Sequence, residues 1–345
     1  MNSGLQWPEA LPGYAGLAPL LAFVVALALT ALLVRARWQW ALDQPNERSL
    51  HSTVVPRTGG LAIMSGSLAA VALIAALGGD LPWLTIGAPA AGLVLLSLFD
   101  DRLNLPVRVR LPLHLLAALL FTLPLALAGG GVAWVWVPVI VIGVAGFANL
   151  FNFMDGANGL AGGMALFGFS AYGLGLLGVG GGIGDPALAA LCFALATAAA
   201  GFLCFNFGGR IFMGDAGSVP LGFLAAAIGV KGWAAGHWSC WFPLLVFAPF
   251  ALDGTITVLK RMARRERFWE AHREHYYQRV VRMGATHKQL AAGAWALMLL
   301  CAAGAVWALG APATAFALIF ATIALLFMVI GLVVDLAWRR HNSRS

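Results

Sequence analysis

The sequence has few charged residues. Only 10% of its 345 residues are Asp, Glu, Lys or Arg, whereas 61% are hydrophobic. A soluble domain needs more polar surface than this composition supplies, so the composition excludes one. The sequence therefore predicts an integral membrane protein.

Cysteine is also scarce, and its spacing indicates no metal site. The four cysteines lie in or at the edge of apolar stretches and form no CxxC pair: Cys192, Cys204, Cys240 and Cys301. Nor does any His/Cys spacing typical of zinc binding occur. We expect the four thiols to be inert core residues.

Long apolar stretches, in contrast, fill the chain. A helix needs about twenty apolar residues to cross the hydrocarbon, and roughly eleven stretches meet this requirement. They lie near residues 14–34, 58–77, 81–99, 111–128, 132–150, 160–180, 187–206, 217–235, 239–258, 289–309 and 313–338. We therefore predict an all-α fold, a polytopic transmembrane helix bundle that forms a single integral membrane domain over residues 1–345.

Basic residues fall on one side of these stretches. Of the 21 Lys and Arg residues, all but Lys231 follow an odd-numbered stretch. Because cytoplasmic loops carry an excess of Lys and Arg, we expect the N-terminus outside and the C-terminus in the cytoplasm. The net charge of +7 then suits anionic headgroups and phosphorylated ligands, and no folded domain is left to bind nucleic acid.

Five aspartates lie at or just inside the expected cytoplasmic ends of four spans. They are Asp100, Asp101, Asp155, Asp215 and Asp253. A carboxylate near a bilayer costs about 3 kcal/mol unless it is solvated, paired or bound to a metal. Asp100 and Asp101 alone could be a solvated helix end, but the five aspartates together predict a site for a hard cation such as Mg²⁺. Such a cation is usually shared between one or two carboxylates and substrate phosphates. The cytoplasmic segments that would form this face are residues 35–57, 100–110, 150–160, 207–216 and 259–288.

Two glycine-rich stretches repeat one design. "RIFMGDAGSVPLGF" places Asp215 between glycines just before a span, and "NLFNFMDGANGLAGG" places Asp155 at a break between two spans. Glycines let backbone amides approach a phosphate, and the positive end of a helix favours the anion. The alternatives are a helix cap at Asp215 and an ordinary turn at Asp155.

The last large polar segment, "KRMARRERFWEAHREHYYQRVVRMGATHK", is strongly basic. If it is helical, four side chains share one face that could bind a diphosphate: His272, His275, Arg279 and Arg282. The alternative is a basic surface helix that lies on anionic lipid.

These motifs together resemble the polyprenyl-phosphate N-acetylhexosamine-1-phosphate transferases, a family of integral membrane enzymes. The matching segments occur in family order: "NERSLHSTVVPRTGGLAI", "FDDR", "NLFNFMDGANGLAGG", "FNFGGRIFMGDAGS" and "LDGTITVLKRMARRERFWEAHREHYYQRV". Five ordered matches are far more specific than any one of them.

The resemblance implies transfer of a sugar 1-phosphate from a UDP-sugar to undecaprenyl phosphate in the bacterial inner membrane, with the active site facing the cytoplasm. It implies Mg²⁺, or Mn²⁺ in its place, as the cofactor, with Asp215 as metal ligand. Asp100 and Asp101 would position or deprotonate the lipid phosphate, and His275 would act beside the diphosphate. Further substrate-binding residues by motif position are Asn149, Asn152, Asp155, Asn206, Phe212, Arg279, His272, His51 and Arg57, with Phe212 as the platform for uracil. A homodimer is compatible with the resemblance.

One departure from the family concerns the choice of sugar. Many members carry a run of histidines where this chain reads His275-Tyr276-Tyr277-Gln278. This difference argues against the peptidoglycan translocase, which stays the alternative, and favours an initiator of O-antigen or related polysaccharides. We expect Tyr276 and Tyr277 either to border the sugar or to act as interfacial anchors.

A transporter is the alternative from another class of protein, because transporters also place charged groups at helix breaks. The expected carboxylates, however, gather at one face rather than along a pathway. This distribution favours an enzyme.

Overall fold

The computed structural model describes residues 11–36, 42–43, 54–103, 105–128, 132–179, 181, 184–267 and 272–343. Over these residues the chain is almost entirely helical, which confirms the predicted all-α class. The elements are α1 (Tyr14–Ala36), β1 (Leu42–Asp43), β2 (Val55–Pro56), α2 (Gly59–Ala76), η2 (Trp83–Gly87), α3 (Ala88–Leu103), α4 (Val107–Leu127), η3 (Trp134–Trp136), α5 (Val137–Phe153), α6 (Leu160–Leu176), α7 (Pro186–Asn206), α8 (Asp215–Ala234), α9 (Trp241–Val246), α10 (Ala248–Ala263), α11 (Tyr276–Arg282), α12 (His287–Ala308) and α13 (Ala313–Asn342). β1 and β2 form one short antiparallel pair.

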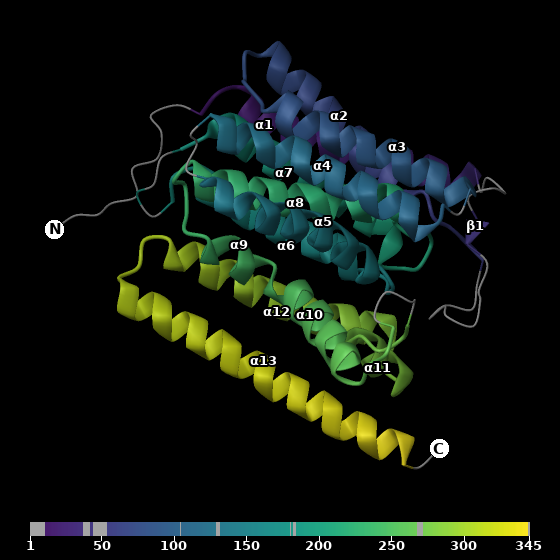
Figure 1. Cartoon of the computed structure of the whole chain (residues 1–345). Coiled ribbons are helices and arrows are strands. Elements are labelled where there is room, and N and C mark those ends of the chain that lie inside the picture. The colour runs from purple at the N-terminus through teal and green to yellow at the C-terminus, as the bar shows by residue number, and fades with distance from the viewer. Residues whose placement is uncertain are drawn as a thin grey trace.

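Helices α1 to α8 form a tight bundle, and α9 to α13 lie along one side of it (Figure 1). Helix α7 packs against α1, α2 and α6, while α8 packs against α3 and α5. Both helices are rich in Ala and Gly, which let neighbouring backbones approach closely. The most buried helices therefore lie directly behind the Asp215 motif.

The described part of the chain contains nine helical stretches that are long and apolar enough to cross a membrane. Two of the roughly eleven predicted spans do not meet this measure. One is α6, which has 17 residues, and the other is divided into α9 and α10 at Phe247, just before Pro249. A helix restarts readily at such a point, because proline has no N–H to donate. The number of spans and the orientation of the termini stay predictions.

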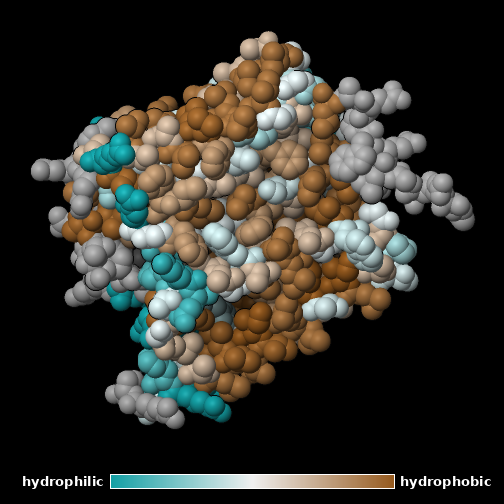
Figure 2. All heavy atoms as spheres, turned by 180° about the vertical axis from the view of Figure 1, so that it is seen from behind, coloured by the Kyte–Doolittle hydropathy of each residue, from teal (hydrophilic) through white to brown (hydrophobic). Residues whose placement is uncertain are grey.

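Polar side chains gather at one end of the molecule, and brown apolar surface covers most of the rest (Figure 2). In Figure 1 this is the end at which β1, α11 and the last turn of α13 lie. It is also the end that carries the aspartate motifs.

Two details of the sequence-based picture are wrong. Cys192 and Cys301 are buried as expected, but Cys204 and Cys240 are exposed rather than core residues. Helix α10 ends at Ala263 and α11 begins only at Tyr276, so the basic segment is not one helix. His272 and His275 precede α11 and cannot share a helical face with Arg279 and Arg282.

Candidate active site

A backbone seam holds the Asp215 motif in place. Phe212 N–H donates to the Pro56 carbonyl at 2.8 Å, Gly59 N–H to the Phe212 carbonyl at 2.9 Å, and Gly60 N–H to the Met213 carbonyl at 2.8 Å. These bonds join the segment before α2 to the segment before α8. Residues 56–60 and 211–217 are called the seam below.

Glycine is required at two points of the seam. Gly214 has φ +74°, and a Cβ there would lie 2.3 Å from the Arg57 carbonyl oxygen. A Cβ on Gly60 would lie 2.3 Å from the Cα of Gly217. Because backbone meets backbone at these two points, the two segments are held closely and the first residue of α8, Asp215, has a fixed position.

Asp215 lies among other polar groups of the predicted site. Its carboxylate accepts a hydrogen bond from the Asn152 side chain, and its Oδ2 is 3.9 Å from Nη1 of Arg110. Its side chain is 28% exposed, which leaves it open to a ligand. The charges of Asp100 and Asp155 also act on it. Four of the five predicted aspartates therefore come from segments that meet here, once Asp101 beside Asp100 is included.

Asp100 and Asp101, in the last turn of α3, each have a cationic partner. Asp100 accepts hydrogen bonds from Nη1 of Arg110 and from the Leu105 backbone N–H, both at 2.7 Å. Asp101 Oδ1 lies 3.3 Å from Nη2 of Arg57, which also donates to the Asp101 carbonyl oxygen at 3.0 Å. Both Asp100 oxygens are therefore engaged in hydrogen bonds, which fix the orientation of this carboxylate.

Asp155 lies in the loop between α5 and α6, and its pKa is raised well above the ordinary value. The main cause is desolvation by burial, followed by the negative charge of Asp215, while a hydrogen bond from the Gly214 backbone N–H lowers it. The Asp155 and Asp215 carboxylates repel each other where burial limits their solvation, and such a pair favours binding of either a proton or a cation.

The donors present fit a magnesium ion that is shared with a ligand. No group of three or more His, Cys, Asp or Glu side chains that could hold a metal occurs among the residues that the structure describes. Mg²⁺, however, is commonly bound by one or two carboxylates together with substrate phosphates. Asp215 and Asp155 could supply that pair of carboxylates.

Asp253, in contrast, does not belong to this cluster, so the prediction of one site with five aspartates is wrong. Its Oδ1 accepts from the Tyr276 N–H at 2.9 Å and its Oδ2 from the Tyr277 N–H at 3.0 Å, and Nδ1 of His275 lies 3.3 Å from Oδ1. The Asp253 carboxylate thus caps the first turn of α11.

Tyr277 holds the loop that carries Asp155. Its ring is 5% exposed, its hydroxyl donates to the Phe153 carbonyl at 2.9 Å, and the Gly156 backbone N–H donates to it. Burial, with the charges of Asp253 and Asp155, raises the pKa of the phenol, so it stays neutral. The Tyr277 ring is thus packed against the loop of Asp155, and Tyr276 contacts Lys260 and Asp335, so a role of either tyrosine in choosing the sugar stays a prediction.

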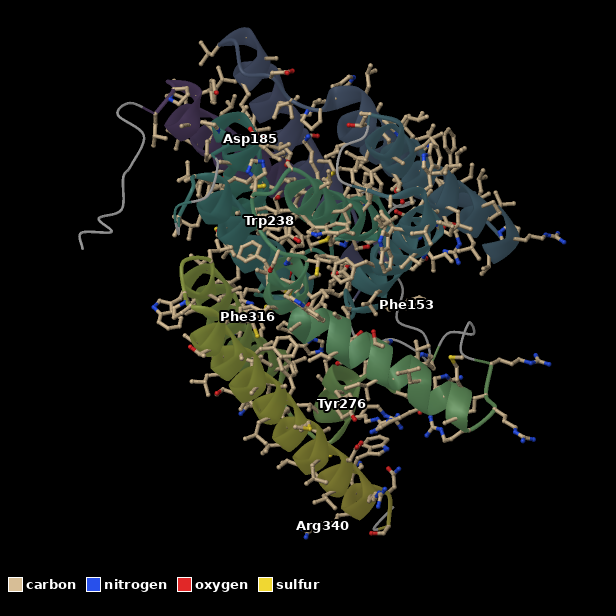
Figure 3. All side chains as sticks on the ribbon, turned by 60° about the vertical axis from the view of Figure 1, so that its left-hand side comes forward. Phe153, Asp185, Trp238, Tyr276, Phe316 and Arg340 are labelled. Atoms are coloured by element: carbon tan, nitrogen blue, oxygen red, sulfur yellow. The ribbon has the colours of Figure 1, made fainter. Side chains whose placement is uncertain are left out.

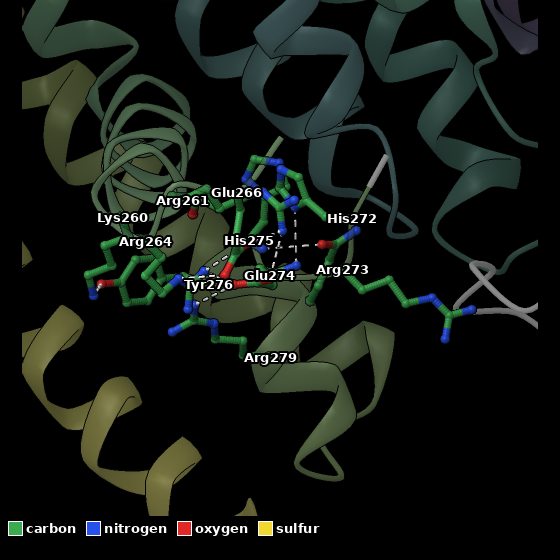
Figure 4. A network of polar contacts seen from close by, with 12 residues as sticks. Lys260, Arg261, Arg264, Glu266, His272, Arg273, Glu274, His275, Tyr276 and Arg279 are labelled. Carbon is green, nitrogen blue, oxygen red and sulfur yellow. Dashed lines mark hydrogen bonds and ion pairs between the residues drawn. The ribbon is translucent and has the colours of Figure 1, made fainter. Parts of the chain in front are cut away.

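The remaining residues around α11 bind one another, as Figure 4 shows. Arg279, 5% exposed, donates to Asp335 Oδ1 at 3.0 Å and lies 3.6 Å from Glu274 Oε2. His275 is 2% exposed. His272 is the more open of the two histidines, and burial together with the positive charges around it lowers its pKa to about 4. The predicted diphosphate-binding helical face of His272, His275, Arg279 and Arg282 is therefore not formed.

Three asparagines differ in what their side chains do. Asn206, 4% exposed, accepts from the Gly159 N–H at 2.7 Å and donates to the Ile211 carbonyl at 2.8 Å, so it joins two loops instead of offering its amide to a nucleotide. Asn149 donates to the Ala145 carbonyl one turn earlier in α5. Asn152 faces Asp215.

Two predicted residues remain, Phe212 and His51. Phe212 is half-buried in the seam, with its backbone paired on both sides. His51 lies outside the described residues.

Sequence reasoning missed two residues that shape the site. Arg110 bridges Asp100 and Asp215, but in the sequence it was only one of several basic residues after α3. The available signal was its position in the first turn of α4, which faces the end of α3. Tyr277 was misplaced because its partner is a backbone carbonyl, which no sequence pattern marks.

Comparison with known proteins agrees with this arrangement. The sequence model of glycosyl transferase family 4 matches residues 83–232, which include Asp100, Asp155 and Asp215. Decaprenyl-phosphate N-acetylglucosaminephosphotransferase of Mycobacterium tuberculosis is 31% identical over 300 residues, which cover 72% of this chain and 71% of that protein.

Two further relatives have similar names. The probable undecaprenyl-phosphate N-acetylglucosaminyl 1-phosphate transferase of Bacillus subtilis is 27% identical and covers 77% of this chain and 78% of its own length. The undecaprenyl-phosphate alpha-N-acetylglucosaminyl 1-phosphate transferase of Yersinia pestis is 28% identical, over 86% of this chain and 85% of its own length. The chain therefore belongs to the polyprenyl-phosphate N-acetylhexosamine-1-phosphate transferases of glycosyl transferase family 4.

Proposed function

We propose that the protein transfers N-acetylglucosamine 1-phosphate from UDP-N-acetylglucosamine to undecaprenyl phosphate and releases UMP. The observation that carries this proposal is the meeting of Asp215, Asp155, Asn152 and Arg110 at one polar end of an apolar bundle. The names of the relatives support the choice of sugar and lipid. The product would start a surface polysaccharide such as O-antigen.

The chemistry requires an oxygen of the lipid phosphate to attack the sugar-bearing phosphorus of the donor, while the bridging oxygen leaves with UMP. Arg57 and Arg110, each ion-paired at the end of α3, supply positive charge for the acceptor phosphate. Asp100 keeps Arg110 directed toward Asp215. The acceptor is already a dianion near neutral pH, so its attack needs no strong base.

Asp215 and Asp155 would hold Mg²⁺, and the chemistry that this ion would supply when bound is neutralisation of phosphate charge. Asn152 would keep the Asp215 carboxylate in one orientation through its hydrogen bond. The seam supports the Asp215 side chain, because it fixes the backbone of that residue.

An apolar cavity is available for a lipid chain. It has a volume of about 330 Å³ and is lined by apolar residues of α2 and α3, among them Leu61, Met64 and Leu95, so it adjoins the helix ends that carry Arg57 and Asp100. An isoprenoid tail needs such an apolar lining.

The test is release of UMP from membranes that contain the protein, undecaprenyl phosphate and Mg²⁺. We expect UMP only when a UDP-N-acetylhexosamine is present, with UDP-N-acetylglucosamine the best donor of a panel that includes the GalNAc, FucNAc and QuiNAc nucleotides. No UMP with any donor would refute the proposal, and a peptidoglycan translocase would instead require the muramoyl-pentapeptide nucleotide.

The orientation of the site is part of the proposal, with the polar end of Figure 2 in the cytoplasm of a bacterial inner membrane. In a variant without the four native cysteines, a cysteine at Gly184 should react with an impermeant maleimide in intact cells, and one at Arg265 should not. The opposite labelling would place the site where no UDP-sugar is available.

A further inference from the structure

The last helix contains an acid in an unusual place. Helix α13 has 30 residues, of which only Ile323 is buried, so most of its side chains point away from the bundle. A carboxylate at the centre of a membrane-spanning helix costs about 3 kcal/mol, and acids within such helices are generally paired. Asp335 is such an acid, and it lies in the part of α13 that passes α11.

Asp335 is paired with groups from two other elements. Its Oδ2 accepts hydrogen bonds from Nζ of Lys260, at the end of α10, and from the hydroxyl of Tyr276 at 3.2 Å. Its Oδ1 accepts from Nη1 of Arg279 at 3.0 Å. Tyr276 lies between α10 and α13 in Figure 3. Asp335 therefore ties α10 and α11 to α13.

Aromatic rings strengthen this tie. The guanidinium carbon of Arg279 lies 5.4 Å from the ring centre of Tyr276 and 5.9 Å from that of Trp338 on α13. Arg282 lies 4.6 Å from the Trp338 ring centre. Cations at these distances are attracted to the ring faces, so the side of α11 that carries both arginines is fixed against α13.

The other side of α11 is fixed to the loop of Asp155. Tyr277 binds the Phe153 carbonyl and the Gly156 N–H. A Cβ on Gly156 would lie 2.1 Å from the Tyr277 hydroxyl, so Tyr277 packs directly against the Gly156 backbone. Helix α11 has seven residues, and its two sides thus connect Asp335 to the loop.

We propose that Asp335 is a positioning residue for the transfer reaction. Asp335 holds Arg279 and thereby α11, and α11 keeps Tyr277 in contact with residues 153–156. Asp335 thus determines the position of Asp155 on the donor side of the site. The inference rests on the proposed function. Asp335 itself touches neither substrate, and a membrane anchor alone would not need a carboxylate paired with Lys260 and Arg279.

The position of the coupled loop predicts which substrate is affected. Asp155 and Asn152 adjoin Asp215, where the donor diphosphate would bind with Mg²⁺, whereas Arg57 and Asp101 lie at the end of α3 assigned to the lipid phosphate. Asp335→Asn should therefore raise the KM for UDP-N-acetylglucosamine about tenfold and change the KM for undecaprenyl phosphate by less than about twofold.

Matched variants separate positioning from loss of fold. Asp335→Glu keeps the charge and should recover most of the donor KM, while Arg340→Gln removes a charge from the same helix end and should behave as wild type. A merely structural role would lower kcat per milligram of protein and leave both KM values unchanged. That result for Asp335→Asn would overturn the proposal.

A double-mutant cycle tests the route. Tyr277→Phe removes the hydroxyl that binds the loop, so adding Asp335→Asn to it should raise the donor KM by less than about twofold more. Two effects that multiply fully would mean that Asp335 does not act through Tyr277, and the proposal would fail.

Hydrogen exchange supplies a measurement that does not depend on activity. Backbone amides of residues 153–159 should exchange about tenfold faster in Asp335→Asn than in wild type, and those of residues 56–60 should not change. Unchanged exchange at 153–159 would contradict the coupling. If wild-type protein released no UMP, the proposed function would fail, yet this measurement would still decide whether α13 positions the loop.

Discussion

The two ends of the active face are built differently. Around Asp215, backbone hydrogen bonds and glycine contacts bring α2, α5 and α8 together and leave the carboxylate partly open. Around α11, charged and aromatic side chains pair with one another, and both Arg279 and His275 are nearly inaccessible. Polar motifs at the ends of buried helices are thus accessible to ligands here, whereas the more densely charged segment mainly stabilises itself.

Removal of the Asp215 charge should have the largest effect of all. Asp215→Asn should keep the fold and lower kcat about a thousandfold or more, since the amide cannot bind Mg²⁺ as a carboxylate does. UMP release is the measurement. The matched control is Asp185→Asn, the same change at the N-cap of α7, where Asn also caps well. Near-normal activity of Asp215→Asn at millimolar Mg²⁺ would remove Asp215 from the site.

A methyl group in the seam should be the next most damaging change. Gly60→Ala places a Cβ against the Gly217 backbone and should cost about 2 kcal/mol of unfolding free energy, with loss of activity, because backbone cannot move aside as a side chain can. Thermal unfolding in detergent measures this. Gly92→Ala in α3 is the control, because its Cβ would meet nothing within 4 Å. Equal melting temperatures for the two variants would show that the seam tolerates movement.

The loss of one hydroxyl at α11 should have a smaller effect. Tyr277→Phe should lower kcat/KM about tenfold. The factor should be the same for every UDP-sugar, because a buried ring does not discriminate between donors. Tyr172→Phe is the control, since it also loses a buried hydroxyl, which donates to the Ala225 carbonyl away from the site. A changed ranking among UDP-sugars would return Tyr277 to the sugar pocket.

The smallest effect should come from His272. Its pKa falls from 6.5 to about 4 on folding, so the side chain is neutral at pH 7. His272→Gln should therefore leave activity at pH 7 within about twofold. Because the unfolded chain binds the proton more readily, wild-type stability should fall as the pH drops from 6.5 toward 4, and the variant should lose less. If the melting temperatures of wild type and His272→Gln fell by the same amount between pH 7 and pH 5, this assignment would be contradicted.

The comparison also explains what the sequence could predict. Hydrophobic stretches predicted the helices, and the glycine-flanked aspartates predicted which helix ends meet, because such motifs need only local rules. The partners of Asp253, Arg279 and Tyr277 could not be predicted. Each depends on where α11 begins, and Asp253 itself caps that helix from 23 residues earlier in the chain. The division of α9 and α10 at Phe247 was likewise hidden in one apolar stretch.

The seam has a consequence for how members of this family can diversify. Positions whose neighbours are backbone atoms accept almost no replacement. Substitutions at residues 58–60 and 214–217 are therefore rarely available to change the specificity for the donor sugar. Selection for a different donor sugar should instead enrich substitutions at residues 264–267 and 272–274, where partly exposed arginine and glutamate side chains pair with one another outside the helices. A library confined to those residues should yield more active variants than one of equal size confined to the seam.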